Sequence, residues 1–199
     1  RCSLIEAIEN AENDDRGHGD CVAGHGADVI RLAANADYVI ATPLAPGSDT
    51  ALPLITSTLT IEGYGSTIRR LDRPATPAFR FMVSYEADLT LRNLTFQSGR
   101  LATSYAFEGG AVLWQRGGNL SVSNVRFVDN GVSPNGRGGA IYLSTGAPGL
   151  PTTTVATFED CVFENNFVDA LSGQSGTGGG AIMIEAGMLE IDRCAFVGN

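Results

Sequence analysis

The sequence predicts an all-β chain folded as a right-handed parallel β-helix, a solenoid of stacked coils, with a short capping α-helix at its N-terminus. Three observations predict it. A Gly-Gly-Ala motif recurs three times, a Phe-x-x-Asn motif recurs in alternation with it, and apolar and polar residues alternate in between. Alternation is the signature of strands, and a recurring unit of short strands with Gly and Asn turns is typical of a solenoid.

Length and charge limit the organisation and the partners. We expect residues 1–26 to form a capping region and residues 27–199 to form coils that continue in a longer polypeptide. All 13 basic residues are arginine, and 22 acidic residues give a net charge of −9, which argues against binding nucleic acid or anionic lipid. Because no apolar stretch approaches ~20 residues, no transmembrane segment is expected.

The N-terminal segment carries the signals of an amphipathic helix. Ser3 and Glu6 have the spacing of a capping box. The apolar residues of this segment share one helical stripe that can cover the first coil: Leu4, Ile5, Ile8 and Ala11. Strands are then expected over residues 27–32, 38–40, 55–61 and 79–83.

The repeats indicate where each coil lies and how long it is. The Gly-Gly-Ala motifs begin at Gly109, Gly138 and Gly179, and the phenylalanines of the second motif are Phe127, Phe163 and Phe196. A degenerate copy has Phe96, with Gly99 where the asparagine would be. The four phenylalanines are 31, 36 and 33 residues apart, as loop insertions on a fixed coil would produce. A β-sandwich, the alternative fold, gives no reason for such alternation.

Two columns of side chains should face the interior. Alternation puts each phenylalanine on the same face as the residue two positions earlier: Leu94, Val125, Cys161 and Cys194. The two cysteines are expected there as small apolar residues rather than as a second disulfide. The asparagines Asn130, Asn166 and Asn199 should turn the chain in the left-handed conformation and hydrogen-bond their amides from coil to coil.

The capping region holds two further cysteines, Cys2 and Cys21, which flank the helix and a polar loop. A disulfide between them would stabilise the cap by about 3 kcal/mol and would place the protein outside the cytoplasm. The rival interpretation is a zinc site completed by His18 and His25, although the spacing matches no zinc pattern closely.

Several segments resemble known secreted proteins. Residues 2–8, Cys-Ser-Leu-Ile-Glu-Ala-Ile, resemble the Cys-Ser-Leu-Arg-Glu-Ala-Ile motif that begins a family of bacterial secreted right-handed parallel β-helix proteins. Residues 26–30 and 52–63 are similar to the same family. The repeats resemble those of the chlamydial polymorphic membrane proteins, which are surface adhesins and autotransporter passengers. The resemblance spans nearly the whole chain and implies an extracellular or cell-surface β-helix.

An enzyme is the alternative function, because parallel β-helices also carry polysaccharide lyases and glycoside hydrolases. A hydrolase needs two or three carboxylates around the glycosidic oxygen. The nearest match, Asn-Asp-Asp at 13–15 with His18 and His25 in Gly-His-Gly motifs, crowds one N-terminal loop, which favours coincidence. The acidic residues of the last coils are expected to form a solvated face, with calcium or sugar contact as the alternative: Glu159, Asp160, Glu164, Glu190 and Asp192. No catalytic residue is assigned.

Trp114 and Tyr142 are the candidate ligand-binding residues. They follow Gly-Gly-Ala motifs in successive coils, where paired rings would suit sugars, and ordinary packing on the flank is the alternative. The sequence thus favours a non-enzymatic secreted or cell-surface module: an adhesin, a stalk or a filament component. We expect a polysaccharide or another cell-surface ligand, self-association into filaments as a further mode, and neither a cofactor nor a metal.

Overall fold

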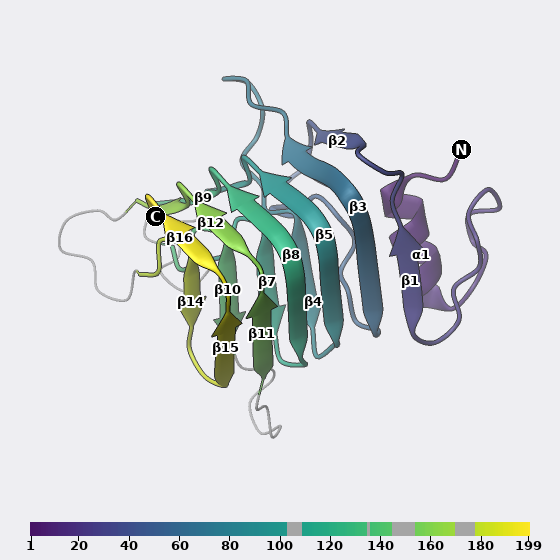
Figure 1. Ribbon diagram of the computed structural model, residues 1–199. Coiled ribbons are helices and arrows are strands. Elements are labelled where there is room, and N and C mark those ends of the chain that lie inside the picture. The colour runs from purple at the N-terminus through teal and green to yellow at the C-terminus, as the bar shows by residue number, and fades with distance from the viewer. Residues whose placement is uncertain (103–108, 135, 145–153, 170–177) are drawn as a thin grey trace.

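The computed structural model describes residues 1–102, 109–134, 136–144, 154–169 and 178–199. Over these residues the chain winds into a parallel β-solenoid of about five turns, with a single short helix at its N-terminus (Figure 1). The predicted fold class is therefore confirmed. The helix lies against the first strand at one end of the stack, and the C-terminus lies at the other end (Figure 1).

The largest sheet runs along one side of the solenoid, and we call it the large sheet. Its strands are β1 (Asp28–Arg31), β2 (Asp37–Ile40), β3 (Leu59–Arg70), β5 (Leu89–Gln97), β8 (Leu120–Val128), β11 (Val155–Glu159), β12 (Val162–Glu164), β15 (Met188–Asp192) and β16 (Ala195–Val197). The main order is β1-β3-β5-β8-β11-β15, with β2 beside β3, β12 beside β8 and β16 beside β12, all parallel. Sequential turns therefore lie side by side, as a solenoid requires.

Two smaller parallel sheets complete the later turns. The second sheet has the order β14 (Ile182–Ile184), β10 (Ile141–Ser144), β7 (Leu113–Arg116), β4 (Met82–Tyr85). The third sheet has the order β13 (Phe167–Val168), β9 (Gly131–Ser133), β6 (Arg100–Ala102). One turn runs from β5 through β6 and β7 to β8, so the three sheets enclose a continuous core.

The first strands lie where the sequence places them, and the next two begin later than expected. Ile55 forms an isolated bridge to Ser84, and β3 starts only at Leu59. Phe79 forms an isolated bridge to Arg100, and β4 starts at Met82. Ile55 and Phe79 are fully buried, so their apolar character reflects burial in irregular backbone rather than an extended ladder.

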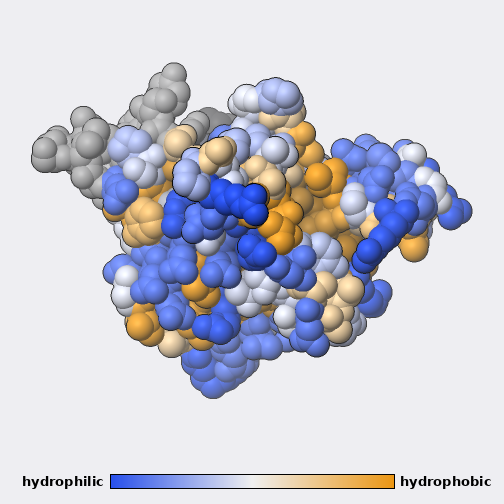
Figure 2. Space-filling model, turned by 90° about the horizontal axis from the view of Figure 1, so that it is seen from above, coloured by the Kyte–Doolittle hydropathy of each residue, from blue (hydrophilic) through white to orange (hydrophobic). Residues whose placement is uncertain are grey.

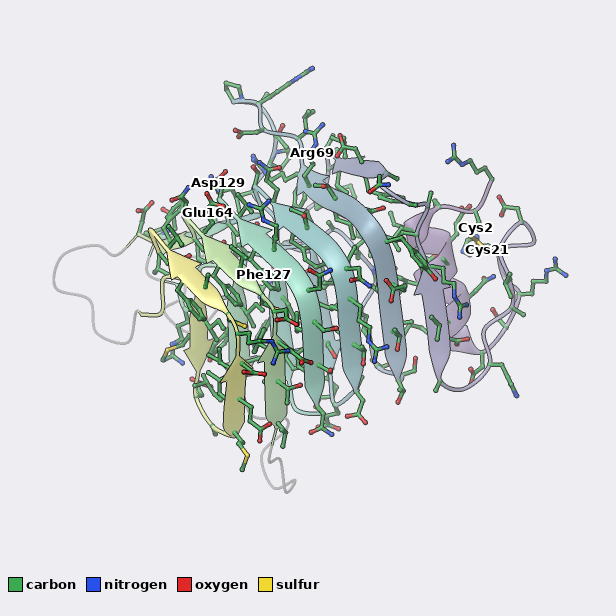
Figure 3. All side chains as sticks on the ribbon, viewed as in Figure 1. Cys2, Cys21, Arg69, Phe127, Asp129 and Glu164 are labelled. Atoms are coloured by element: carbon green, nitrogen blue, oxygen red, sulfur yellow. A yellow bond between two sulfur atoms is a disulfide. The ribbon has the colours of Figure 1, made fainter. Side chains whose placement is uncertain are left out.

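The phenylalanine column fills the interior as predicted, except at the last turn, where Phe196 is 47% exposed. The ring of Phe127 stacks on Phe96 at 5.9 Å and on Phe163 at 4.7 Å, and Phe163 stacks on Phe196 at 4.7 Å, measured between centroids. Figure 3 shows Phe127 beside β8 within the stack. The column two residues earlier also faces inward, since Leu94 pairs in register with Val125 and both are buried. Alternation alone therefore located both inner columns.

Cys161 and Cys194 continue that second column as free thiols. Cys161 is fully buried, and its backbone N–H donates to Sγ of Cys194 at 3.3 Å. Burial raises the pKa of the Cys161 thiol to about 12.

This burial predicts slow thiol chemistry in the folded protein. At pH 8, Cys161 should react with a disulfide reagent at least ~100-fold more slowly than an unfolded thiol, because the thiolate is the reactive form. Counting thiols over time, with and without denaturant, checks this, and a Cys161→Ala variant assigns the slow phase. Fast modification of both thiols in the native protein would contradict it.

The asparagine column forms the predicted ladder of side-chain amides. Asn130 Nδ2 donates to Asn166 Oδ1 at 2.9 Å, and Asn166 Nδ2 donates to Asn199 Oδ1 at 2.8 Å. At the first turn, the backbone N–H of Gly99 donates to Asn130 Oδ1 at 2.9 Å. The expectation of a left-handed backbone at these asparagines was wrong, because the residue before each position adopts it instead: Ser98, Asp129, Asn165 and Gly198. The bend is thus made one residue earlier, which leaves the amides free to point along the stack.

The glycine motifs lie in a different register from their sequence alignment. Because Leu113 pairs with Ile141, the first motif is shifted by one residue, and Gly109 pairs with Arg137. A Cβ on Gly109 would lie 1.7 Å from the Arg137 carbonyl oxygen, so glycine is required there. The left-handed glycines that align across the turns are Gly110, Gly138 and Gly179.

Helix α1 (Leu4–Asn13) caps the first turn as predicted. Ser3 and Glu6 form the capping box, with the Ser3 N–H donating to Glu6 Oε2 at 2.7 Å. Ile8 is fully buried against the solenoid core. The carboxylate of Glu12 docks the helix on the loop before β3: Thr56 Oγ1 donates to its Oε2 at 2.8 Å, and Ser57 Oγ donates to its Oε1 at 3.0 Å.

The cap is closed by a disulfide between Cys2 and Cys21, whose sulfur atoms lie 2.01 Å apart beside α1 (Figure 3). Replacing both cysteines by serine should lower the free energy of unfolding by about 3 kcal/mol, because the bond closes a short loop. Urea denaturation measures the loss. Reduction of the wild-type protein should reproduce it and should leave the double variant unchanged; an unaltered midpoint in both experiments would contradict the prediction.

Candidate functional site

Aromatic and arginine side chains gather on the outer side of the second sheet, on a surface we call the arginine–aromatic face. It comprises Arg80, Tyr85, Trp114, Arg116, Arg137 and Tyr142. In β7, Leu113 and Gln115 are fully buried, so Trp114 and Arg116 point outward by alternation. Trp114 pairs in register with Tyr142 on β10, which places residues from successive turns side by side.

The structure brings the two predicted ligand-binding residues together. The rings of Trp114 and Tyr142 stack with centroids 5.9 Å apart and planes 25° apart. The indole N–H of Trp114 donates to Ser144 Oγ at 2.9 Å. Tyr142 is only 2% exposed, whereas Trp114 is partly exposed, so Trp114 offers the accessible part of the pair.

Arg80 contacts the ring of Trp114 from the preceding turn. Its side chain is fully buried, with its guanidinium carbon 5.0 Å from the Trp114 ring centroid. One terminal nitrogen donates to Asp49 Oδ2 at 2.7 Å, and the other donates to the Gly109 carbonyl at 2.6 Å. Burial alone would raise the pKa of Asp49, but the Arg80 charge and hydrogen bond outweigh it and hold the pKa below its usual range. Asp49 is therefore an ionised counter-charge.

Arg137 plays the same part beside Tyr142. It forms an ion pair with Glu185 and donates to the Tyr142 hydroxyl at 3.0 Å, with its guanidinium carbon 5.8 Å from the Tyr142 ring centroid. Burial, and then the hydrogen bond with Glu185, raise the pKa of Tyr142 to about 12. The Tyr142 ring is thus held neutral and fixed in place.

Arg116 differs from both of these arginines. Its guanidinium carbon lies 4.8 Å from the Trp114 ring centroid and 5.2 Å from the Tyr85 ring centroid. Within the described part of the chain, no carboxylate pairs with it and no acceptor meets its N–H groups, and its Nε atom is buried without a partner. Among the described residues, the arginine–aromatic face therefore contains one partly exposed cation that lacks a counter-charge.

The arginines of this face were missed by sequence reasoning. Arg116 stands two residues after Trp114, so alternation could have placed both on one surface. Tyr85 joins them only through the pairing of β4 with β7, which unequal loop lengths conceal.

The acidic residues of the N-terminal loop hold its backbone. Oδ1 of Asp14 accepts the Gly26 N–H at 2.5 Å, and Oδ1 of Asp15 accepts the Gly17 N–H at 2.9 Å. Both carboxylates are therefore engaged in hydrogen bonds that shape the loop.

The four residues of the alternative zinc site are not assembled as ligands. The sulfur atoms of Cys2 and Cys21 are bonded to each other. His18 Nε2 lies 2.5 Å from Glu9 Oε2, and the backbone N–H of His25 donates to the Asp28 carboxylate at 3.1 Å. The two sulfur atoms and the His18 imidazole thus have partners of their own, and in the described ranges the four residues form no cluster of ligand atoms.

One cluster of possible metal ligands lies near that disulfide. Among the described residues, Glu6, Asp20 and Cys21 bring ligand atoms within 4.8 Å of one another. Asp20 Oδ2 lies 2.7 Å from the backbone nitrogen of Arg1, Glu6 belongs to the capping box, and the Cys21 sulfur is in the disulfide. These bonds account for the clustering.

The acidic residues of the last turns surround an arginine on the exposed side of the large sheet. Arg193 pairs with Glu159, Asp160 and Asp192. Hydrogen bonds from Arg193 lower the pKa of Asp160. This arrangement is an exposed ion-pair network, which agrees with the expected solvated face.

A groove of about 470 Å³ separates the cap from the first turns. Apolar side chains gather beside it on the face seen in Figure 2. They include Leu4, Ile5, Tyr38, Val39, Ile40 and Leu52. Two of its polar side chains are already engaged, since Asp37 pairs with Arg69 at 2.7 Å and Ser3 belongs to the capping box. The groove is thus less suited to orient a polar ligand than the arginine–aromatic face.

No helix in the described ranges is long and apolar enough to cross a membrane. Comparisons with known protein families, with curated proteins and with solved structures find no match to this chain. The resemblance to secreted β-helix proteins accordingly rests on the sequence motifs alone.

Proposed function

We propose that this chain is a non-enzymatic, extracellular or cell-surface β-helix module that holds a polysaccharide on the arginine–aromatic face. The observation that carries the proposal is the partly exposed indole of Trp114, fixed by Tyr142 on the next turn and by Arg80 beneath it. A rigid, amphipathic aromatic ring suits the apolar face of a sugar and needs little ordering on binding.

The electrostatics of this face favour holding a ligand over cleaving one. Asp49 and Glu185, the carboxylates that contact its arginines, are both paired, with Arg80 and Arg137 respectively. A general acid for glycoside cleavage needs a raised pKa, whereas the pKa of Asp49 is lowered. Paired carboxylates are therefore better suited to fix the arginines than to move protons.

The proposed location rests on the cap and the motifs. Disulfides persist in oxidising compartments, so the bond between Cys2 and Cys21 supports export. The resemblance of residues 2–8 to secreted β-helix proteins supports the same location. A stack of hydrogen-bonded turns is also a suitable rigid stalk, on which successive turns can present several weak contacts to one polymer.

The test is binding and turnover measured on one panel of acidic and neutral polysaccharides. We expect at least one polymer to bind intact, with neither new reducing ends nor unsaturated products, with and without calcium. Trp114→Ala should weaken that binding about tenfold through loss of the ring contact. Tyr64→Ala removes an exposed ring from the large sheet and is the matched control.

Two results would contradict the proposal. Calcium-dependent unsaturated products or new reducing ends would establish the lyase or hydrolase alternative. If wild type and Trp114→Ala bind the polymer equally well, the arginine–aromatic face is not the binding site.

A further inference from the structure

Within the described ranges, the charges of the arginine–aromatic face are unbalanced at one position. Arg80 has Asp49 and Arg137 has Glu185, but Arg116 has no carboxylate among the described residues. Arg116 is half-buried between two rings, where water can reach only part of it.

The terminal N–H groups of Arg116 meet no acceptor in the described part of the chain, while its guanidinium contacts two aromatic rings. A guanidinium that stacks on aromatic rings uses its flat face, and its N–H groups lie along the edge in a planar fork. That fork matches the two oxygens of a carboxylate or the oxygens of a sulfate. The Nε atom is buried without a partner, so the terminal nitrogens, which are not buried in this way, are the donors that a ligand can reach.

Trp114 and Arg116 also have a suitable spacing. They stand two residues apart on one strand with both side chains outward, which places their Cα atoms about 7 Å apart. One sugar could thus contact the exposed part of the indole while an acidic group of the same or the adjoining sugar reaches the guanidinium.

On these grounds, and resting on the proposed function, we infer that the polymer is anionic and that Arg116 binds its carboxylate or sulfate groups. Arg116 is then the residue that distinguishes acidic from neutral sugars, and Trp114 contributes the contact that both kinds share. The ligand class is an acidic polysaccharide such as a uronic acid polymer.

The experiment compares matched polymers and matched variants by calorimetric titration. The polymers are alginate, polygalacturonate and hyaluronan, each beside its carboxyl-reduced neutral form, together with dextran sulfate. The variants are Arg116→Gln, Arg116→Lys, Trp114→Ala and the control Arg92→Gln, which removes an exposed arginine from the large sheet.

We expect an acidic polymer to bind at least tenfold more tightly than its neutral form, and Arg116→Gln to abolish that preference. Arg92→Gln should bind as wild type does. Arg116→Lys keeps the charge without the planar fork and should retain only part of the preference, which separates recognition from misfolding. Selective binding of dextran sulfate with the same loss in Arg116→Gln would support the inference and identify the anion as sulfate.

The two proposals fail differently. Suppose that acidic and neutral polymers bind equally, that Arg116→Gln binds as wild type does, and that Trp114→Ala weakens the binding of both. The inference about charge is then overturned, while the proposed function stands. If no polymer binds, or binding ignores both Trp114 and Arg116, the proposed function is overturned as well.

Discussion

Replacing Phe127 by alanine is expected to lower the free energy of unfolding by about 3–5 kcal/mol. The Phe127 ring is fully buried between Phe96 and Phe163, at centroid distances of 5.9 and 4.7 Å. The neighbouring rings are anchored in their own turns and cannot close the gap, so the variant keeps a cavity in the middle of the stack. Equilibrium denaturation in urea measures the loss.

A matched substitution separates cavity from ring stacking. Phe127→Leu retains most of the apolar volume and should lose less than Phe127→Ala, on the order of 1–2 kcal/mol. If Phe127→Ala unfolds within about 1 kcal/mol of wild type, the ring column does not hold the turns together.

Replacing Asn130 by aspartate should destabilise the solenoid in a pH-dependent manner. The Asn130 amide donates to the Phe96 carbonyl at 3.1 Å and to Asn166 Oδ1 at 2.9 Å, and all three groups are buried. An ionised carboxylate would lose both donors and would face two oxygens. The expected loss is about 3 kcal/mol at pH 7, from two lost hydrogen bonds, repulsion of the two oxygens and a buried charge.

Lowering the pH should reduce that penalty. The pKa of the introduced carboxyl is expected to rise on folding, so its destabilisation is largest above this raised pKa and shrinks as pH falls through it. A protonated carboxyl can donate one of the two hydrogen bonds. Urea midpoints of Asn130→Asp relative to wild type at pH 7 and pH 4.5 check this, with Asn130→Ala as a control that has no such pH dependence. Equal losses at both pH values would contradict it.

Features that are built from the same residue type in successive repeats could be predicted from the sequence. The phenylalanine and asparagine columns recur with the same residue types, so alternation located the inward rings and the amide ladder without knowledge of the turns. The cap was predicted for a different reason, because the signals of Ser3 and Glu6 are local and do not depend on winding.

Features that depend on register could not be predicted. The first Gly-Gly-Ala motif is offset by one residue from its sequence alignment with the second, because Leu113 pairs with Ile141. The residues of the motif alone do not reveal that pairing. The arginine–aromatic face is a stronger case. Tyr85 and Arg116 come from turns joined by loops of unequal length, so only the winding of the chain brings them together. Trp114 and Tyr142 were predicted as a pair because both follow a recognisable motif.

The most direct measurement uses Trp114, the single tryptophan of the chain, as a reporter of its own surface. Tryptophan emission and its quenching by acrylamide should be recorded while the polysaccharide that binds is added. If the polymer lies on the arginine–aromatic face, the emission changes to saturation and quenching falls as the indole is covered. If the polymer binds, as sedimentation would show, while emission and quenching stay constant, the ligand lies elsewhere and the central claim is contradicted.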